Sequence, residues 1–189
     1  MRTSERDDMA VKICITGPVG SIKAEALSRI IEMLQKDGLT VQGVLVSEVV
    51  ENNKLVGYSI FDISSKKRAV FAQSGIVSRV KLDKLGVDTR VLEEILIPSL
   101  QKARENADVI VIDEVGKLEN LTKSVQKEIG ETLRTEKPII VTLHKKSRNP
   151  VLQEIRSLEG VRVFDITPIN KNIMPFRVLR VLNGEEGAA

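Results

Sequence analysis

Two adjacent carboxylates follow a short apolar run in the second half of the chain. Asp113 and Glu114 come directly after residues 109–112, which are all valine or isoleucine. A buried strand that ends in carboxylates delivers them to the edge where open α/β sheets bind their ligands. At such a position an Asp can hold magnesium and the next Glu can polarise an attacking water. The alternative interpretation is a core strand that ends in a solvated acidic turn.

A glycine turn near the N-terminus offers groups for the same chemistry. Gly17 and Lys23 follow a predicted strand at residues 11–16 and match the phosphate-binding pattern G-x-x-x-x-G-K-[ST]. In that pattern backbone N–H groups converge on phosphate oxygens, the lysine reaches the terminal phosphates and the hydroxyl coordinates magnesium. Ile22 replaces the second glycine and Ala24 the hydroxyl, so a generic turn between strand and helix is the alternative. The cradle would comprise Gly17, Pro18, Val19, Gly20, Ser21, Ile22, Lys23 and Ala24.

The segments after the glycine turn predict a helix and an antiparallel hairpin. Apolar residues at helical spacing predict a helix that Gly38 caps. Two strand-like runs then surround turn-forming residues at 51–54. Strands are expected at residues 41–50, 55–63, 69–73 and 79–82. The basic run 66–68 is interpreted as a turn, with a phosphate contact as the alternative.

The second half of the chain alternates strands with helices. A helix is expected at residues 89–106, with Pro98 expected to kink it, and a second helix carries Val125, Ile129 and Leu133 at intervals of four. Strands are expected at residues 109–112, 139–143 and 161–166, and further helices at Asn149-Pro150 and Thr167-Pro168. This alternation is typical of right-handed crossovers in a parallel sheet.

The composition is that of one globular domain with an aliphatic core. Of the 189 residues, 42% are hydrophobic but only 3% are aromatic, and Trp is absent. Such an aliphatic bias suits a parallel sheet that is buried on both faces. We expect a single domain at residues 11–183, a flexible tail at 1–10 and a disordered tail at 184–189.

Charge and cysteine content narrow the function classes. The formal net charge of +3 is far below the dense basic surface that duplex nucleic acid requires, so a phosphate-bearing small molecule is the better partner. No apolar run approaches the ~18 residues of a membrane span, and the N-terminus lacks the apolar core of a signal peptide. Cys14 is the only cysteine and is expected in the core. The sequence therefore predicts a cytoplasmic protein with no membrane association, and it names no protein partner.

The two motifs together resemble a known family. The chain is similar to the small P-loop nucleoside-triphosphatases of thermophiles and to the cancer-related nucleoside-triphosphatase. The resemblance rests on G-P-V-G-S-I-K, on residues 43–58 beside G-[FY]-x-[ST]-x-E-[IV]-R, on D-E-x-G-K-x-E at 113–119, and on residues 167–172 beside T-x-x-N-R-[DN]. It implies a RecA-like P-loop α/β domain, with a mostly parallel central sheet flanked by helices and an antiparallel hairpin extension.

The resemblance also implies roles for individual residues. Lys23 would bind the β and γ phosphates, Asp113 would hold Mg²⁺, and Glu114 would be the general base in hydrolysis of nucleoside triphosphate to diphosphate and phosphate, with little base selectivity. The family's pattern is missing at Ile22, Ala24, Val50 and Lys171. In the usual loop geometry Ile22 would need a positive φ at a cost of ~1–2 kcal/mol, so the loop is expected to be remodelled. Slow hydrolysis follows.

Two alternatives remain beside this hydrolase. The first is an inactive nucleotide-binding or structural relative that acts through a partner, in which Lys23 pairs directly with Asp113 or Glu114 because adjacent carboxylates need a counter-ion. The second is a nucleotide or RNA kinase, for which the basic segment 66–68 with Arg79 is the candidate acceptor site.

Overall fold

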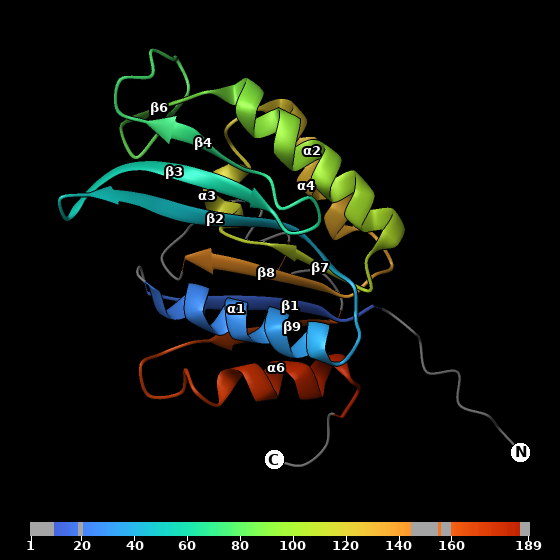
Figure 1. Cartoon of the computed structure of the whole chain (residues 1–189). Coiled ribbons are helices and arrows are strands. Elements are labelled where there is room, and N and C mark those ends of the chain that lie inside the picture. Colours follow the sequence, from blue (N-terminus) through green and yellow to red (C-terminus); the bar gives the residue numbers. More distant parts are fainter. Residues whose placement is uncertain (1–9, 19–20, 145–154, 156–159, 186–189) are drawn as a thin grey trace, which may run out of the picture.

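The fold is built on one sheet of nine strands, against which the helices pack. The computed structural model describes residues 10–18, 21–144, 155 and 160–185, and within these the strand order is β5-β6-β4-β3-β2-β7-β8-β1-β9 (Figure 1). The strands are β1 Lys12–Gly17, β2 Val41–Glu51, β3 Lys54–Asp62, β4 Arg68–Gln73, β5 Lys81–Leu82, β6 Leu85–Val87, β7 Val109–Ile112, β8 Ile139–His144 and β9 Val161–Asp165. The helices are α1 Ser21–Lys36, α2 Thr89–Asn106, α3 Val115–Leu118, α4 Lys123–Leu133 and α6 Met174–Leu182.

The sheet has a parallel half and an antiparallel half. Strands β2, β7, β8, β1 and β9 pair in parallel, so their carboxyl ends share one edge. Strands β3, β4, β6 and β5 continue the sheet from β2 in antiparallel pairs. The predicted α/β class, with a mostly parallel central sheet and an antiparallel hairpin extension, is confirmed.

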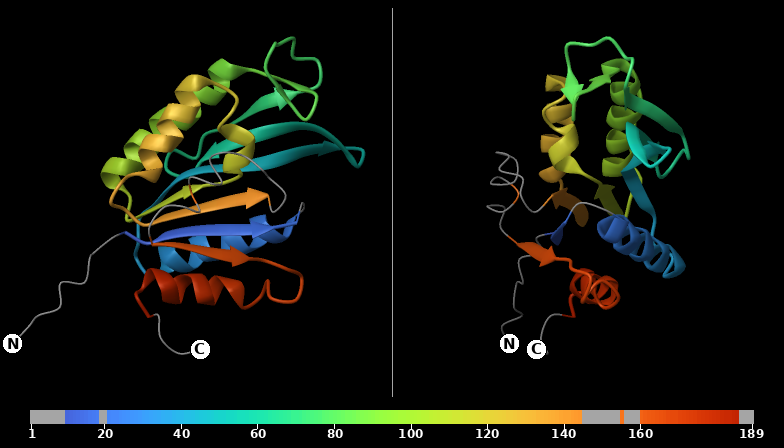
Figure 2. Two further views of the ribbon diagram at one scale, coloured as in Figure 1. Left: turned by 180° about the vertical axis from the view of Figure 1, so that it is seen from behind. Right: turned by 90° about the vertical axis from the view of Figure 1, so that its left-hand side faces the viewer.

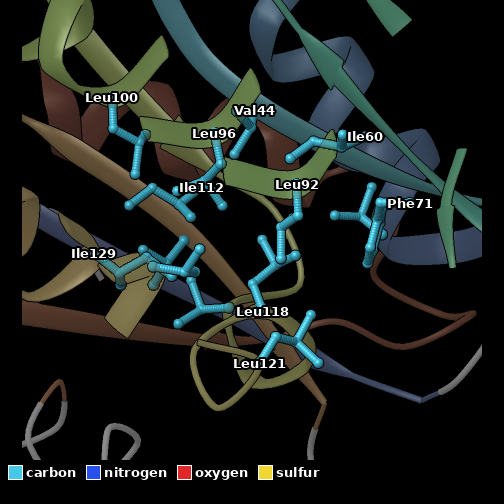
Figure 3. Packing of buried hydrophobic residues seen from close by; sticks show 14 of the residues in the cluster. Val44, Ile60, Phe71, Leu92, Leu96, Leu100, Ile112, Leu118, Leu121 and Ile129 are labelled. Atoms are coloured by element: carbon cyan, nitrogen blue, oxygen red, sulfur yellow. The ribbon is translucent and has the colours of Figure 1, made fainter. Parts of the chain in front are cut away.

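Helices cover both faces of the parallel half (Figure 2). Helices α2, α3 and α4 pack on one face and α1 and α6 on the other. Figure 3 shows the first of these cores, where Leu92, Leu96 and Leu100 of α2 meet Val44 and Ile112 of the sheet. In β7, Ile110 and Ile112 face this core, while Val109 and Val111 face the other. Burial on both faces explains why β7 is an unbroken apolar run.

Several local predictions are confirmed. Gly38 follows α1 with φ +84°, and Leu39 N–H donates to the carbonyl of Leu34 at 3.1 Å, which closes the helix. Cys14 is fully buried. Helix α2 runs unbroken through Pro98, so the predicted kink remains a prediction. No helix in the described ranges is both long and apolar enough to cross a membrane.

The predicted start of the last helix is wrong. Helix α6 begins at Met174 rather than at Thr167-Pro168. Thr167 and Asn170 bind each other instead, because Thr167 N–H donates to Asn170 Oδ1 at 2.8 Å and Asn170 N–H donates to Thr167 Oγ1 at 3.3 Å. Such reciprocal side-chain bonds favour a turn over a helix. The helix predicted at Asn149-Pro150 lies outside the described residues.

The predicted turn at the basic run is organised by Asp62. This carboxylate is buried, and it accepts hydrogen bonds from Ser64 N–H at 2.8 Å and from the hydroxyls of Ser64, Ser65 and Ser99 at 3.0, 2.6 and 3.1 Å. Burial by itself raises the pKa of Asp62, but the hydrogen bonds outweigh it, so the pKa lies below its usual value. The ionised form is therefore the one that stabilises the fold.

Asp62→Asn is expected to make the free energy of unfolding depend less on pH in the acid range. A carboxylate whose folded pKa is depressed stabilises the native state above its unfolded pKa of ~3.9 and loses this effect as the pH falls through the folded value. The variant should lose about 1–3 kcal/mol at pH 6 and much less at pH 2.5. Urea unfolding between pH 2.5 and 6 measures both, with the exposed Asp37→Asn as control. An equal loss at both pH values would contradict the prediction.

Candidate active site

Three elements bring the predicted catalytic side chains together. The carboxyl ends of β1, β8 and β7 are adjacent in the sheet. Strand β1 leads into the glycine turn and the start of α1, which carries Lys23, and β7 leads into Asp113 and Glu114. Open α/β sheets bind their ligands at this edge.

Asp113 is buried and held by two hydrogen bonds. Its side chain accepts from Val46 N–H at 3.1 Å and from the Thr142 hydroxyl, and the residue is only 5% exposed. Burial raises the pKa of Asp113 to about 6 and the Glu114 charge adds to this, while the two hydrogen bonds and Lys23 act in the opposite direction. The carboxylate is thus fixed in orientation by the sheet itself.

Glu114 has a left-handed backbone, with φ 51° and ψ 44°. This conformation is uncommon for a non-glycine residue and often marks a functional position. Its N–H donates to Thr142 Oγ1 at 2.9 Å, so one hydroxyl binds both acidic residues. The turn interrupts the alternation of side chains along the strand. The Glu114 carboxylate is thereby free to meet Lys23.

Lys23 connects α1 to the carboxylates. Its ammonium lies 2.9 Å from Glu114 Oε1 and donates to the carbonyl of Leu143 at 3.2 Å. The residue is 3% exposed, and a buried ammonium needs such partners. The ion pair expected under the inactive alternative is therefore present, with Glu114 as the partner. The pair neutralises one of two adjacent carboxylates. A catalytic site needs this neutralisation as much as an inactive one, so the pair does not distinguish the two interpretations.

The glycine turn packs closely against the segment after β9. A Cβ on Gly17 would lie 2.6 Å from Ile166 Cγ2 and 3.0 Å from the Ile166 carbonyl oxygen, so only glycine fits. Pro18 is exposed, and Val19 and Gly20 lie outside the described residues. These contacts fix the start of the predicted cradle against the residue that follows β9.

The residues that depart from the phosphate-binding pattern lie inside α1. Helix α1 begins at Ser21, and Ile22 packs against the core beneath it without a positive φ. The strain that the usual loop geometry would impose on Ile22 is absent, because the helix already includes it. Ala24 is exposed on the same helix and offers no hydroxyl.

A second group of residues lies beside Glu114. Lys117 Nζ lies 3.9 Å from Glu114 Oε2 and 4.4 Å from the centroid of the Tyr58 ring. Tyr58 is buried, and its hydroxyl donates to Asp83 Oδ2 at 2.6 Å. Burial, this hydrogen bond and the charges of Asp83, Glu48 and Glu114 raise the pKa of Tyr58 above its usual value. The hydroxyl therefore keeps its proton.

Sequence reasoning missed Thr142 and Asp83. Thr142 comes beside Asp113 only because Ile112 pairs with Val141 in the sheet, a register that the sequence does not reveal. The other departures from the family pattern lie apart: Val50 is exposed in the hairpin, and Lys171 pairs with Glu25 at 3.5 Å.

The donor set suits magnesium bound together with a phosphate ligand. Within the described ranges, no cluster of three or more His, Cys, Asp or Glu residues could cage a metal ion. Mg²⁺ does not require such a cage, since it usually keeps several waters and binds through one or two carboxylates and the substrate phosphates. Asp113 supplies one fixed carboxylate at the correct edge of the sheet, and Ala24 supplies nothing.

Comparisons with known proteins agree with this arrangement. The family model described as NTPase matches residues 12–179. The nucleoside-triphosphatase THEP1 of Thermoplasma volcanium is 74% identical over 94% of this chain and all of that protein, and that of Picrophilus torridus is 68% identical over 93% of this chain and 98% of that protein. The crystal structure of THEP1 from Aquifex aeolicus superposes with a TM-score of 0.78 at 26% identity, covering 91% of this chain and 99% of that one. The solution structure of a human cancer-related nucleoside triphosphatase gives 0.78 at 25% identity, over 94% of this chain and 100% of that one.

Proposed function

The chain belongs to the nucleoside-triphosphatase family, and from this premise we propose that it hydrolyses nucleoside triphosphates slowly at the site formed by Lys23, Asp113 and Glu114. The products are a nucleoside diphosphate and phosphate, with little selectivity for the base. The observation that carries the proposal is the convergence of Lys23, Asp113 and Glu114 at the edge where β1, β8 and β7 end, with the Lys23 ammonium 2.9 Å from the Glu114 carboxylate. The cytoplasmic location and the single domain at residues 11–183 stay predictions.

Each of the three side chains has its own task in the proposed reaction. Lys23 binds the β and γ phosphates and offsets their charge. Asp113 would hold Mg²⁺, which would supply positive charge to offset that of the phosphate oxygens. Glu114 orients a water molecule and accepts its proton. The water oxygen bonds to the γ phosphorus as the bond from phosphorus to the bridging oxygen breaks, and the diphosphate leaves.

The proposed slowness follows from Ala24. Without a hydroxyl at this position, Asp113 would be the one proposed side-chain ligand of Mg²⁺, and the metal would be held less firmly. The same feature is what supports the inactive alternative. Phosphate release from the purified protein separates the two, because an inactive relative would release none. A nucleotide-binding titration with and without Mg²⁺ then distinguishes an inactive nucleotide-binding relative from a purely structural one.

Ala24→Thr is expected to raise the rate of phosphate release. A hydroxyl at this exposed first-turn position of α1 adds one metal ligand, worth about tenfold in rate if it contributes ~1.4 kcal/mol. Steady-state phosphate release from ATP and GTP measures the natural protein and the variant. Ala24→Val has a similar shape without the hydroxyl and is the matched control. No phosphate release from the natural protein would contradict the proposed function, and equal gains for Thr and Val would contradict the role of the hydroxyl.

A further inference from the structure

The Glu114 carboxylate is contacted from two sides by ammonium groups. Lys23 Nζ lies 2.9 Å from Oε1, and Lys117 Nζ lies 3.9 Å from Oε2. The two lysines come from different elements, α1 and the short helix α3. Both contacts are partly shielded from water, because the exposed fractions are 4% for the Lys23 side chain, 25% for Lys117 and 17% for Glu114. Each contact therefore acts on the carboxylate with little screening.

The two lysines differ in what else they bind. In the proposed reaction Lys23 must contact the terminal phosphates. Its ion pair with Glu114 therefore weakens when substrate binds. Lys117 has a different second partner, since its ammonium lies 4.4 Å from the centroid of the Tyr58 ring, well inside the range of a cation–π contact. The Tyr58 contact does not compete with phosphate. Lys117 can therefore hold Glu114 throughout the reaction.

Tyr58 is a rigid platform for Lys117. The ring is 2% exposed in β3, where Tyr58 pairs with Glu48 of β2 and Ala72 of β4. Its hydroxyl donates to Asp83 Oδ2 at 2.6 Å, and Asp83 has φ 47° in the tight turn between β5 and β6. A series of contacts thus runs from Glu114 through Lys117 and Tyr58 to this turn.

Glu114 needs such support because of its backbone. Its left-handed conformation places the carboxylate beyond the end of β7, where the sheet does not fix its side chain as it fixes that of Asp113. An oriented general base requires partners that lock its rotamer. We propose that Lys117, supported by the ring of Tyr58, is a positioning residue that keeps the Glu114 carboxylate aimed at the attacking water while Lys23 binds the phosphates. This inference rests on the proposed function of Glu114.

Steady-state hydrolysis by a small set of variants tests the role of Lys117. Lys117→Met is expected to lower kcat by about tenfold to a hundredfold, the range for partners that orient an active-site ligand, with KM changed less than about twofold. Lys117→Arg should restore most of kcat, since a guanidinium can contact both the ring and the carboxylate. Tyr58→Leu should lower kcat in the same direction, and adding it to Lys117→Met should cost little more. Lys127→Met is the matched control, because it removes an exposed pair with Glu131 at 3.6 Å.

The decisive comparison is made in a Glu114→Gln background. If Lys117 acts through Glu114, adding Lys117→Met to Glu114→Gln should cause no further loss of kcat. A full additional loss, or a kcat of Lys117→Met equal to that of the natural protein, would overturn the inference. Thermal melts of each variant identify unfolding, and Lys117→Gln replaces Lys117→Met if the latter does not fold. If Glu114→Gln itself leaves the rate unchanged, the proposed function fails and not only the role of Lys117.

Discussion

Glu114→Gln is expected to lower the rate of nucleoside triphosphate hydrolysis by about 10²–10⁴-fold, the usual contribution of a general base. The amide has nearly the same shape as the carboxylate, and its oxygen can still accept a hydrogen bond from Lys23 at the present 2.9 Å. It cannot accept a proton from water. The variant should therefore keep the fold and bind nucleotide with similar affinity.

Single-turnover phosphate release and calorimetric nucleotide binding together measure this effect. Glu131→Gln is the matched control. Glu131 is an exposed acid near the end of α4 that pairs with Lys127 and Arg104 and not with the residues of the proposed site. A Glu114→Gln rate within a factor of two of the natural one would show that Glu114 is not the base. A loss of binding without a change in rate at saturation would show that it serves the ground state only.

Gly43→Ala is expected to have a large effect on stability. Gly43 lies in β2 beside Val111 of β7, with φ +127°. An added Cβ would lie 2.0 Å from the carbonyl oxygen of Val111 and 2.9 Å from its carbonyl carbon and its nitrogen. These are backbone atoms at the centre of the sheet, so they cannot move aside as a side chain can. We expect a loss of about 4 kcal/mol or more in the free energy of unfolding, or failure to fold.

Gly38→Ala separates the clash from the backbone strain. Gly38 also has a positive φ, +84°, but no atom lies within 4 Å of its added Cβ. That variant should lose only the ~1–2 kcal/mol of the left-handed conformation. Guanidinium unfolding curves of both variants measure the difference, and equal losses would show that the contact with Val111 relaxes.

The side chains proposed to be catalytic could be predicted because they lie next to strong local signals. The unbroken run of β7 predicts a buried parallel strand, and its end identifies Asp113 and Glu114. The glycine turn after β1 identifies Lys23 in the same way. These are short-range patterns, in which the residue types and their spacing carry the information.

The remainder depends on contacts between distant segments. Thr142 joins Asp113 through a strand register. Lys117 of α3 contacts the ring of Tyr58 in β3 across 59 positions of sequence. The start of α6 was mispredicted for another reason: Thr167-Pro168 has the sequence of a helix start, but Asn170 binds Thr167 and forms a turn. A competing local hydrogen bond there overrides a generally valid pattern.

The place of β1 in the sheet determines when this strand can pair during synthesis of the chain. β1 is the first strand made, yet it pairs with β8 and β9, which lie more than 120 residues later in the chain (Figure 1). The hairpin of β2 and β3 needs only neighbouring residues and can form early, since local contacts close faster than distant ones. The strand that leads into the glycine turn must wait, unpaired, until β8 and then β9 have emerged from the ribosome. Nucleotide binding can begin only after nearly the whole chain has been translated.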